Sequence, residues 1–274
     1  MSAVHAAPRA GSVDAGPEIP AWRVLLSRIA TLCIIELWKI RHDRTEIYTR
    51  AIQPMLWLLI YGETFNKLRA IPTGNIPYLA YLAPGIMAQS ALFIAIFYGI
   101  QIIWERDAGV LTKLMATPTP RSALVAGKAF ASGIRAMSQV LIVLALSAVM
   151  RIELNWNPLH LLAAMFFVVI GSAFFTMLSV TLAGLVLKRD RLMGIGQAIT
   201  MPLFFASNAL YPTNLMPGWL QVVSKVNPLS YEVDGLRGVL LGTSSNVALD
   251  LSVLLVALVI GVVAASSLLP RLAR

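Results

Sequence analysis

The chain has 274 residues, of which 58% are hydrophobic and 13% are charged, with a mean hydropathy of +0.75 and a net charge of +9. Soluble domains average about 25% charged residues, and one water-facing core cannot hide this much apolar surface, so the composition predicts a membrane protein. The single cysteine, Cys33, excludes an internal disulfide or a cysteine cluster. The three histidines lack the spacing of a helical metal pair, so no metal site is predicted.

The start of the chain predicts a tail followed by an interface helix. Residues 1–20 are rich in Ala, Pro and Gly without an apolar run of signal-peptide length, which predicts a disordered cytoplasmic tail. Within 21–46, apolar residues fall on one helical face and Arg, Ser and Thr on the other, which predicts a helix lying in the inner membrane interface. Residues 47–274 form the predicted transmembrane domain.

Membrane crossings follow from length and apolarity. A hydrocarbon core of about 30 Å needs roughly 20 helical residues. A weak candidate, 47–65, is interrupted near its start by Arg50, Gln53 and Pro54, and we count it because six crossings leave both ends on one side. The five clear candidates are 78–104, 123–150, 159–187, 193–210 and 249–269.

The distribution of basic residues orients the predicted spans. With the N-terminus in the cytoplasm, most Lys and Arg residues fall on the inner side, so both termini are predicted to be cytoplasmic. Basic residues beside anionic headgroups gain about 1 kcal/mol each. This explains the basic composition better than nucleic-acid binding, and membrane lipids are the expected partners.

The loop between the second and third spans, 104–121, contains a short amphipathic helix that stops at Pro118 and Pro120. Apolar residues at i, i+1, i+4 and i+5 favour a docking face for another protein over a plain connecting loop. The charged and apolar residues of this segment are Glu105, Arg106, Asp107, Val110, Leu111, Leu114 and Met115.

One face of the third span is polar. Arg135 lies about 21 Å of helix rise beyond Arg121, which places it within the inner leaflet. For Lys128 we favour snorkelling of the side chain to the headgroups. For Arg135 two alternatives stay open, snorkelling and a polar path that contacts an anionic substrate group, and Gln139 on the same face is the second candidate pathway residue.

Several activities lack the residues they need. All 13 Asp and Glu residues fall in tails, loops or span ends by this assignment, so no carboxylate is predicted at mid-membrane depth, which disfavours ion-coupled transport. Gly127 and Lys128 lack the upstream glycine of a phosphate-binding loop. No catalytic constellation is grouped within the spans, so an enzyme is not predicted. If ATP drives the protein, another polypeptide binds it.

The late segment 207–238 reads "SNALYPTNLMPGWLQVVSKVNPLSYEVDGLRG", and its prolines cut it into pieces too short to cross a membrane. It predicts two half-depth helices, the first at 207–215 or extending to 219 and the second at 228–241. Such backbone is tolerated only where protein or a water-filled cavity covers it. Glu232, Asp234 and Arg237 are expected near the outer surface, with Asp234 and Arg237 paired.

Three motifs carry a resemblance to a known family. The segments "ERDAGVLTKLMATP", "YLAPGIMAQS" and "YPTNLMPGWLQVVSKVNPLSYEVDGLRG" resemble the membrane subunits of ABC-2 type transporters. That group contains daunorubicin-resistance-like drug exporters and O-antigen, teichoic-acid and nodulation-factor permeases. The resemblance covers nearly the whole chain after residue 20 and implies an all-α, polytopic type V exporter fold. This fold has an interface helix, six transmembrane helices and two short re-entrant helices, here within 207–241.

The resemblance also implies partners and roles. Two permease subunits, identical or related, would face each other in the bacterial cytoplasmic membrane, each docking an ATP-binding subunit. ATP and Mg would bind to that partner, and no cofactor to this chain. Segment 105–117 would be the coupling helix. The late segment would form an outer gate, with candidate residues Tyr211, Pro212, Pro217, Trp219, Asn227, Pro228, Tyr231, Asp234 and Arg237.

The expected function is export of a drug-like or lipid substrate. Fold analogy does not choose the substrate. Export of a lipid-linked polysaccharide or glycolipid is a close alternative, because aromatic residues near the outer half could stack on sugars, although an interfacial aromatic belt explains the same placement. A passive channel or a membrane scaffold without ATP coupling is the alternative of a different class.

Overall fold

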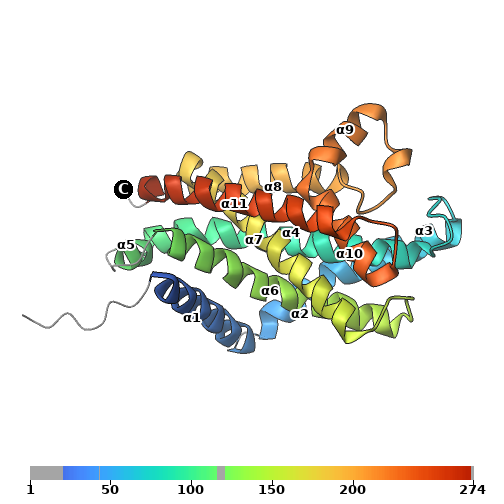
Figure 1. The fold of residues 1–274 in the computed structure, drawn as a ribbon, viewed down its shortest axis with the longest axis horizontal. Coiled ribbons are helices and arrows are strands. Elements are labelled where there is room, and N and C mark those ends of the chain that lie inside the picture. Colours follow the sequence, from blue (N-terminus) through green and yellow to red (C-terminus); the bar gives the residue numbers. More distant parts are fainter. Residues whose placement is uncertain (1–20, 43, 116–120, 273–274) are drawn as a thin grey trace, which may run out of the picture.

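The computed structural model describes residues 21–42, 44–115 and 121–272, and these form a bundle of helices (Figure 1). Four long helices build the bundle: α4 (Tyr78–Asp107), α6 (Arg121–Val149), α7 (Pro158–Val186) and α11 (Val247–Leu272). The other helical segments are α1 (Ala21–His42), α2 (Arg44–Leu56), the π-helical η1 (Trp57–Gly62), α3 (Glu63–Leu68), α5 (Val110–Met115), α8 (Arg189–Phe205), the 3₁₀ turn η2 (Thr213–Leu215), α9 (Gly218–Val226) and α10 (Pro228–Leu241).

Four helices of the described residues are long and apolar enough to cross a membrane, namely α4, residues 122–149 of α6, α7 and α11. They match the predicted spans 78–104, 123–150, 159–187 and 249–269. Apolar residues on the outside of α11, including Val256, Val259 and Ile260, are exposed as expected for a lipid-facing surface. The chain is therefore an all-α, multi-pass membrane protein.

The two other predicted spans have less regular counterparts. Residues 44–68 form one helical stretch in which the π-helical η1 follows Pro54, a residue that lacks a backbone N–H donor. Helix α8 has 17 residues and ends at Phe205, five residues before the predicted boundary, three residues after its internal Pro202. The bilayer crossing of these two segments stays a prediction.

Helix α7 lies at the centre of the bundle and packs against α4, α6, α10 and α11. Its start is fixed locally, since the Asn157 side chain accepts a hydrogen bond from the Leu159 N–H and Pro158 occupies the first helical position. Helix α4 is the most completely buried span. The core therefore runs along the α4–α7 contact.

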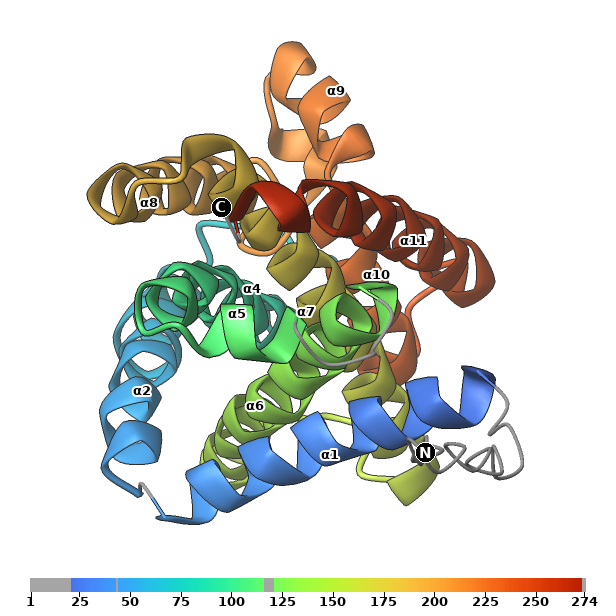
Figure 2. The same cartoon turned by 90° about the vertical axis from the view of Figure 1, so that its left-hand side faces the viewer.

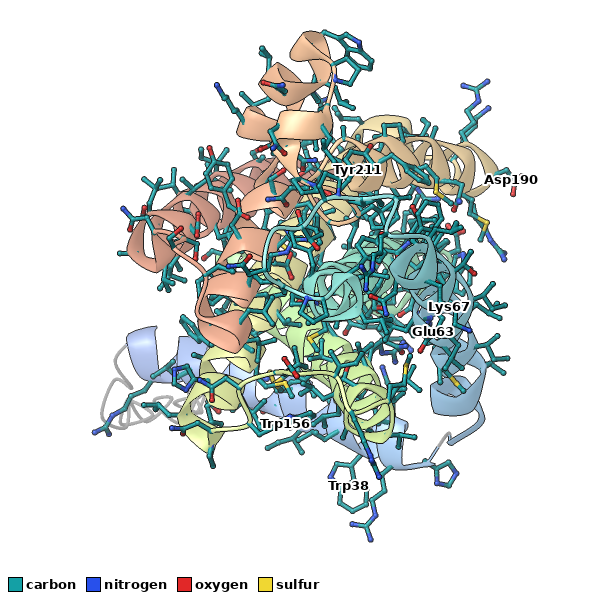
Figure 3. The ribbon with its side chains drawn as sticks, turned by 90° about the vertical axis from the view of Figure 1, so that its right-hand side faces the viewer. Trp38, Glu63, Lys67, Trp156, Asp190 and Tyr211 are labelled. Atoms are coloured by element: carbon teal, nitrogen blue, oxygen red, sulfur yellow. The ribbon has the colours of Figure 1, made fainter. Side chains whose placement is uncertain are left out.

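The two ends of the bundle differ. Helix α5 and the C-terminal end of α11 lie at one end, called here the α5 end, and α3 lies at the other, called the α3 end (Figure 1). Helix α1 packs on α6. When the bundle is viewed from its end, α1 crosses the lower part of the picture (Figure 2). Trp38 of α1 is 70% exposed and points away from the bundle (Figure 3). The position of α1 in the membrane interface stays a prediction.

The late segment forms two short helices. Helix α9 stands out from the bundle beside α8 and α11 (Figure 1) and begins after Pro217, later than the predicted start at 207. Helix α10 occupies the predicted range, because Asn227 caps its first turn and Gly242 ends it in the left-handed conformation. It packs against α4, α7 and α11 inside the bundle.

Candidate functional site

A buried ion pair joins α1, the predicted interface helix, to α6, the third predicted span. Arg135 Nη2 of α6 lies 2.9 Å from Glu36 Oε2 of α1, and Tyr98 of α4 donates its hydroxyl to the other oxygen of Glu36 at 3.0 Å. Burial would raise the pKa of Glu36, but the Lys39 ammonium and the Arg135 guanidinium hold it below its ordinary value. The pathway role of Arg135 stays a prediction, and its ion pair gives the residue a structural role that neither predicted alternative included.

A second charged pair continues this contact toward α5. Lys128 Nζ lies 2.6 Å from Glu105 Oε1 and 5.0 Å from the centre of the Tyr98 ring. Glu105 stands near the end of α4, just before the turn into α5. The polar contacts therefore run without a break from Glu105 through Lys128 and Tyr98 to Glu36 and Arg135. We call these five residues the α5-end network.

The predicted docking segment is a short helix with one buried and one exposed apolar residue. Leu111 is only 1% exposed and belongs to the chain's own core, whereas Val110 is 43% exposed. Met115 is half-buried, and the side chain of Leu114 lies outside the described residues, as do residues 116–120. A partner that docks here therefore meets Val110 rather than Leu111.

The charges before α5 tie the segment to its neighbours. Arg106 contacts the carboxylate of Asp107 at 2.8 Å and donates to the Leu187 carbonyl at the end of α7. Asp107 is exposed. The turn at Gly109 has φ +71°, a left-handed conformation that glycine adopts without strain. The segment that leads into α5 is thus held against the end of α7.

A cavity of about 500 Å³ lies between α2, α4, α6 and α8. It follows residues 90–104 of α4 and so occupies the half of the bundle nearer the α5 end. Gln139 lines it and donates to the Arg50 carbonyl at 2.9 Å, so this predicted pathway residue does face a cavity. We call it the amide cavity after Gln53, Gln101 and Gln139; its aromatic lining is Phe93, Phe97 and Trp104.

At the α3 end, Arg237 of α10 joins three parts of the chain. Its guanidinium donates to the carbonyls of Tyr81, Asn208 and Ala209 at 3.2, 2.9 and 3.1 Å. The guanidinium carbon lies 3.5 Å from the centre of the Tyr81 ring. Arg237 is 3% exposed and therefore buried within the bundle, and its position near the outer side of the membrane stays a prediction. It holds α4, α10 and the segment after α8 together.

The other predicted gate residues divide between this cluster and the surface. Asp234 accepts from Asn208 Nδ2 at 2.6 Å and lies 3.9 Å from Arg237, as expected for the predicted pair. The buried Asn227 donates to the Leu203 carbonyl of α8 at 2.7 Å. Tyr211 contacts the Phe205 carbonyl and Tyr231 the Lys225 carbonyl; Pro212 and Pro228 are half-buried, and Pro217 and Trp219 are exposed.

Gly85 allows α4 to touch the segment after α8. A methyl group at this position would overlap the Ala209 carbonyl, so Gly85→Ala is expected to force the two segments apart and destabilise the protein by about 1–3 kcal/mol. Thermal unfolding of the purified chain measures this. Gly194→Ala is the matched control, because that helical glycine has open space around it. Equal unfolding temperatures of both variants would contradict the close contact.

The comparisons with known proteins identify the family. Residues 27–241 match the model of the ABC-2 type transporter membrane family, a range that includes the α5-end network, the amide cavity and Arg237. The chain belongs to the ABC-2 type transporter family. This ABC-2 permease is also similar to individual transport proteins of several organisms.

Three relatives illustrate the range. A putative transport permease, ycf38, of Cyanophora paradoxa is 30% identical over 68% of this chain, and the match spans 64% of that protein. A daunorubicin resistance ABC transporter permease of Streptomyces coeruleorubidus is 21% identical over 83% of the chain and 80% of the relative. Nodulation protein J of Rhizobium leguminosarum bv. viciae is 27% identical over 80% and 84%.

One residue of the permease was placed wrongly by the sequence. Glu232 was expected near the outer surface, but it is 0% exposed and lies against Gly171 in the middle of α7. The prediction that no carboxylate lies at mid-membrane depth is therefore wrong. The charged residues of this segment did not indicate that Glu232 is buried. Because Asp234 and Arg237 lie on the same helix, the sequence favoured a water-facing position for all three. The apolar residues around it, Leu229, Val233 and Leu236, were the available signal.

Proposed function

We propose that this permease is the membrane-spanning subunit of an ATP-driven exporter in the bacterial cytoplasmic membrane. Its α5 end and both termini face the cytoplasm in this proposal, in agreement with the distribution of Lys and Arg along the chain. Two permease subunits face each other, and each receives an ATP-binding subunit at α5. Support comes from the family match and from relatives that are named as ABC transporter permeases.

The observation that carries the proposal is the place of the amide cavity within the bundle. The amide cavity lies in the half nearer the α5 end, whereas Arg237 and Gly85 hold α4, α10 and the segment after α8 together at the other end. The place of this cavity suits a resting state that accepts a substrate from the cytoplasm or the inner leaflet. Hollows of about 530 and 370 Å³ also lie at the α3 end, the second of them beside Arg237.

The lining of the amide cavity supports an amphipathic substrate. Its volume of about 500 Å³ falls within the range of drug-sized pockets, about 300–1,000 Å³, and its walls combine aromatic rings with a few polar groups. We therefore propose a drug-like or lipid substrate. The rings of Phe93, Phe97 and Trp104 also suit stacking on sugars, which favours a glycolipid as the second candidate.

The α5-end network gives ATP-driven movement a route into the membrane. Closure of the ATP-binding subunits would push α5, and Glu105 would pass the displacement to Lys128 of α6. Tyr98 and Glu36 would carry it further to α1. Because these groups are hydrogen-bonded in a largely buried region, their geometry is better defined than that of a surface ion pair.

A charge on the exposed face of α5 tests the docking site. Val110→Asp is expected to reduce ATP-dependent transport roughly tenfold or more, equal to about 1.4 kcal/mol of lost docking energy, because the carboxylate loses its hydration against an apolar partner surface. The measurement is substrate uptake into inside-out vesicles that contain the permease and its ATP-binding subunit. Leu111→Asp is unsuitable, since Leu111 lies in the core.

Val110→Thr provides the matched control, because threonine has nearly the shape of valine without a charge. We expect it to transport close to the unmodified protein. If Val110→Asp transports as well as Val110→Thr while both assemble with the ATP-binding subunit, the docking assignment of α5 is wrong. Purified permease alone is expected to hydrolyse no ATP.

A further inference from the structure

Glu232 is a carboxylic acid sealed inside the helical bundle. It is 0% exposed, and neither of its carboxylate oxygens has a hydrogen-bond partner among the described residues. The side chain fits because residue 171 of α7 is a glycine: a methyl group there would overlap the carboxyl group. One turn later on α10, Gly235 lies equally close to the ring of Phe167. Helix α10 thus docks on α7 through two close contacts.

The depth of this contact corresponds to the middle of a membrane. Gly171 lies near the midpoint of the 29-residue helix α7, about 20 Å from its start at 1.5 Å per residue. Helix α7 is among the helices long and apolar enough to span the bilayer. The Glu232 carboxyl group therefore occupies the region that is farthest from both aqueous phases.

Nearby charges do not compensate Glu232. Its carboxyl group is fully buried, and no ion pair or hydrogen bond reaches it among the described residues. On its own helix, Asp234 is bound to Asn208, and Arg237 to three carbonyls. The titratable groups on the helices packed against α10 either interact with other residues or lie far from Glu232. Tyr78, Tyr81 and Asp250 interact with Arg237 or Asp234, and His160 lies 11 residues before Gly171 on α7. The remaining groups lie toward the α5 end: Tyr98, Glu105, Arg106, Asp107 and Arg271.

We propose that Glu232 is a proton-binding site that couples its protonation to the docking of α10 on α7. An ionised carboxylate without a hydrogen bond or a counter-charge costs several kcal/mol in such surroundings, whereas the neutral acid does not. A proton can bind to the Glu232 carboxyl group without any additional space around it. A metal ion would need further oxygen ligands, and the described residues contain no group of three that could hold one.

Proton binding and helix position are then linked. While α10 is docked, Glu232 keeps its proton; when α10 moves away from α7, the carboxyl group meets water and releases the proton to it. Low pH therefore favours the docked arrangement and high pH the undocked one. The role of this switch in opening the export path rests on the proposed function, whereas the proton site itself does not.

Infrared spectroscopy tests the protonation state in the full chain, purified into lipid nanodiscs. At neutral pH we expect the carbonyl-stretch band of a protonated carboxylic acid in dry surroundings, and its loss in Glu232→Gln. Asp234→Asn should keep the band, because that residue is hydrogen-bonded and more exposed. If Glu232→Gln retains the band, or the unmodified chain lacks it, the proposal is overturned. Glu232→Met is the second variant should the glutamine variant fail to fold.

Hydrogen exchange measures the coupling to helix position. After correction for intrinsic exchange rates, protection of the α10 amides should fall by up to about tenfold per pH unit as the pH rises, the slope for release of one proton. Glu232→Gln should show no such slope. Equal slopes in both proteins would refute the coupling. A failed transport assay with an intact infrared band would instead count against the export function alone.

Discussion

Replacement of Arg237 by methionine is expected to destabilise the permease by about 3–5 kcal/mol. The guanidinium satisfies the carbonyls of Tyr81, Asn208 and Ala209, and all three would be left without this donor in a region with little water. The loss should appear as a lower thermal unfolding temperature in detergent or nanodiscs.

Two controls separate charge from geometry at this position. Arg237→Lys keeps the positive charge, but one ammonium group cannot reproduce the planar guanidinium that reaches three carbonyls and stacks on Tyr81, so an intermediate loss is expected. Lys225→Met removes an exposed charge on α9 and should leave the unfolding temperature unchanged. If Arg237→Met unfolds at the same temperature as Lys225→Met, the structural role of Arg237 is refuted.

The second large effect is expected at the ion pair between α1 and α6. Glu36→Gln should destabilise the protein by about 3–5 kcal/mol, because it leaves the Arg135 guanidinium beside a neutral group in a buried position. Arg135→Gln should cost a similar amount. The double variant should lose less than the sum, since removing both partners leaves no uncompensated charge. Thermal unfolding of the four proteins completes the cycle.

Lys39→Gln is the control for this cycle. Lys39 also contacts Glu36, but its side chain is 56% exposed, so its removal is expected to cost no more than about 1 kcal/mol.

The contribution of Glu36 to stability depends on pH with a defined sign. Because the folded protein holds the pKa of Glu36 below its ordinary value, the contribution is present above that ordinary value and is lost as the pH falls through the folded-state pKa. Additive losses in the cycle would contradict a direct pair.

The two predictions concern opposite ends of the bundle and need not have the same functional consequence. Loss of the Glu36–Arg135 contact should release α1 from α6 and weaken the route between α5 and the membrane domain. Loss of the Arg237 contacts should loosen the contact between α4, α10 and the segment after α8 at the α3 end. Substrate leak through vesicles that contain the Arg237 variant, compared with the Glu36 variant, therefore distinguishes a closing contact from a transmitting one.

Local sequence signals predicted the elements that depend on local physics. Spans require about 20 apolar residues whatever they pack against, so four of them could be placed within a few residues. The Asn-Pro pairs at 157–158 and 227–228 begin α7 and α10, because the amide caps the first turn and proline suits the first helical position. The motifs around these elements also indicated the family, which the match over 27–241 confirms.

Other features depended on contacts that no local pattern encodes. Glu36 and Arg135 are 99 positions apart, and Arg237 and the Tyr81 carbonyl 156 positions apart. The sequence also could not place Leu111, since an apolar residue on a short cytoplasmic helix suits a partner's groove and the chain's own core equally well. Helix α9 started late because Pro217, rather than Pro212, precedes its first turn.

The sequence by itself determined that this protein is helical and lies in a membrane, because hydropathy, proline and capping residues act within a few turns of chain. The ABC-2 family was indicated by the resemblance of its motifs and is shown by the match over 27–241. Only the tertiary structure decided which charges are buried and paired. Helix α7 is apolar nearly all round, so its sequence marks no preferred face, and only the packing of α10 against it reveals that Glu232 meets Gly171. Rotation and crossing of helices set such contacts, and they minimise the energy of the whole bundle rather than of any one segment.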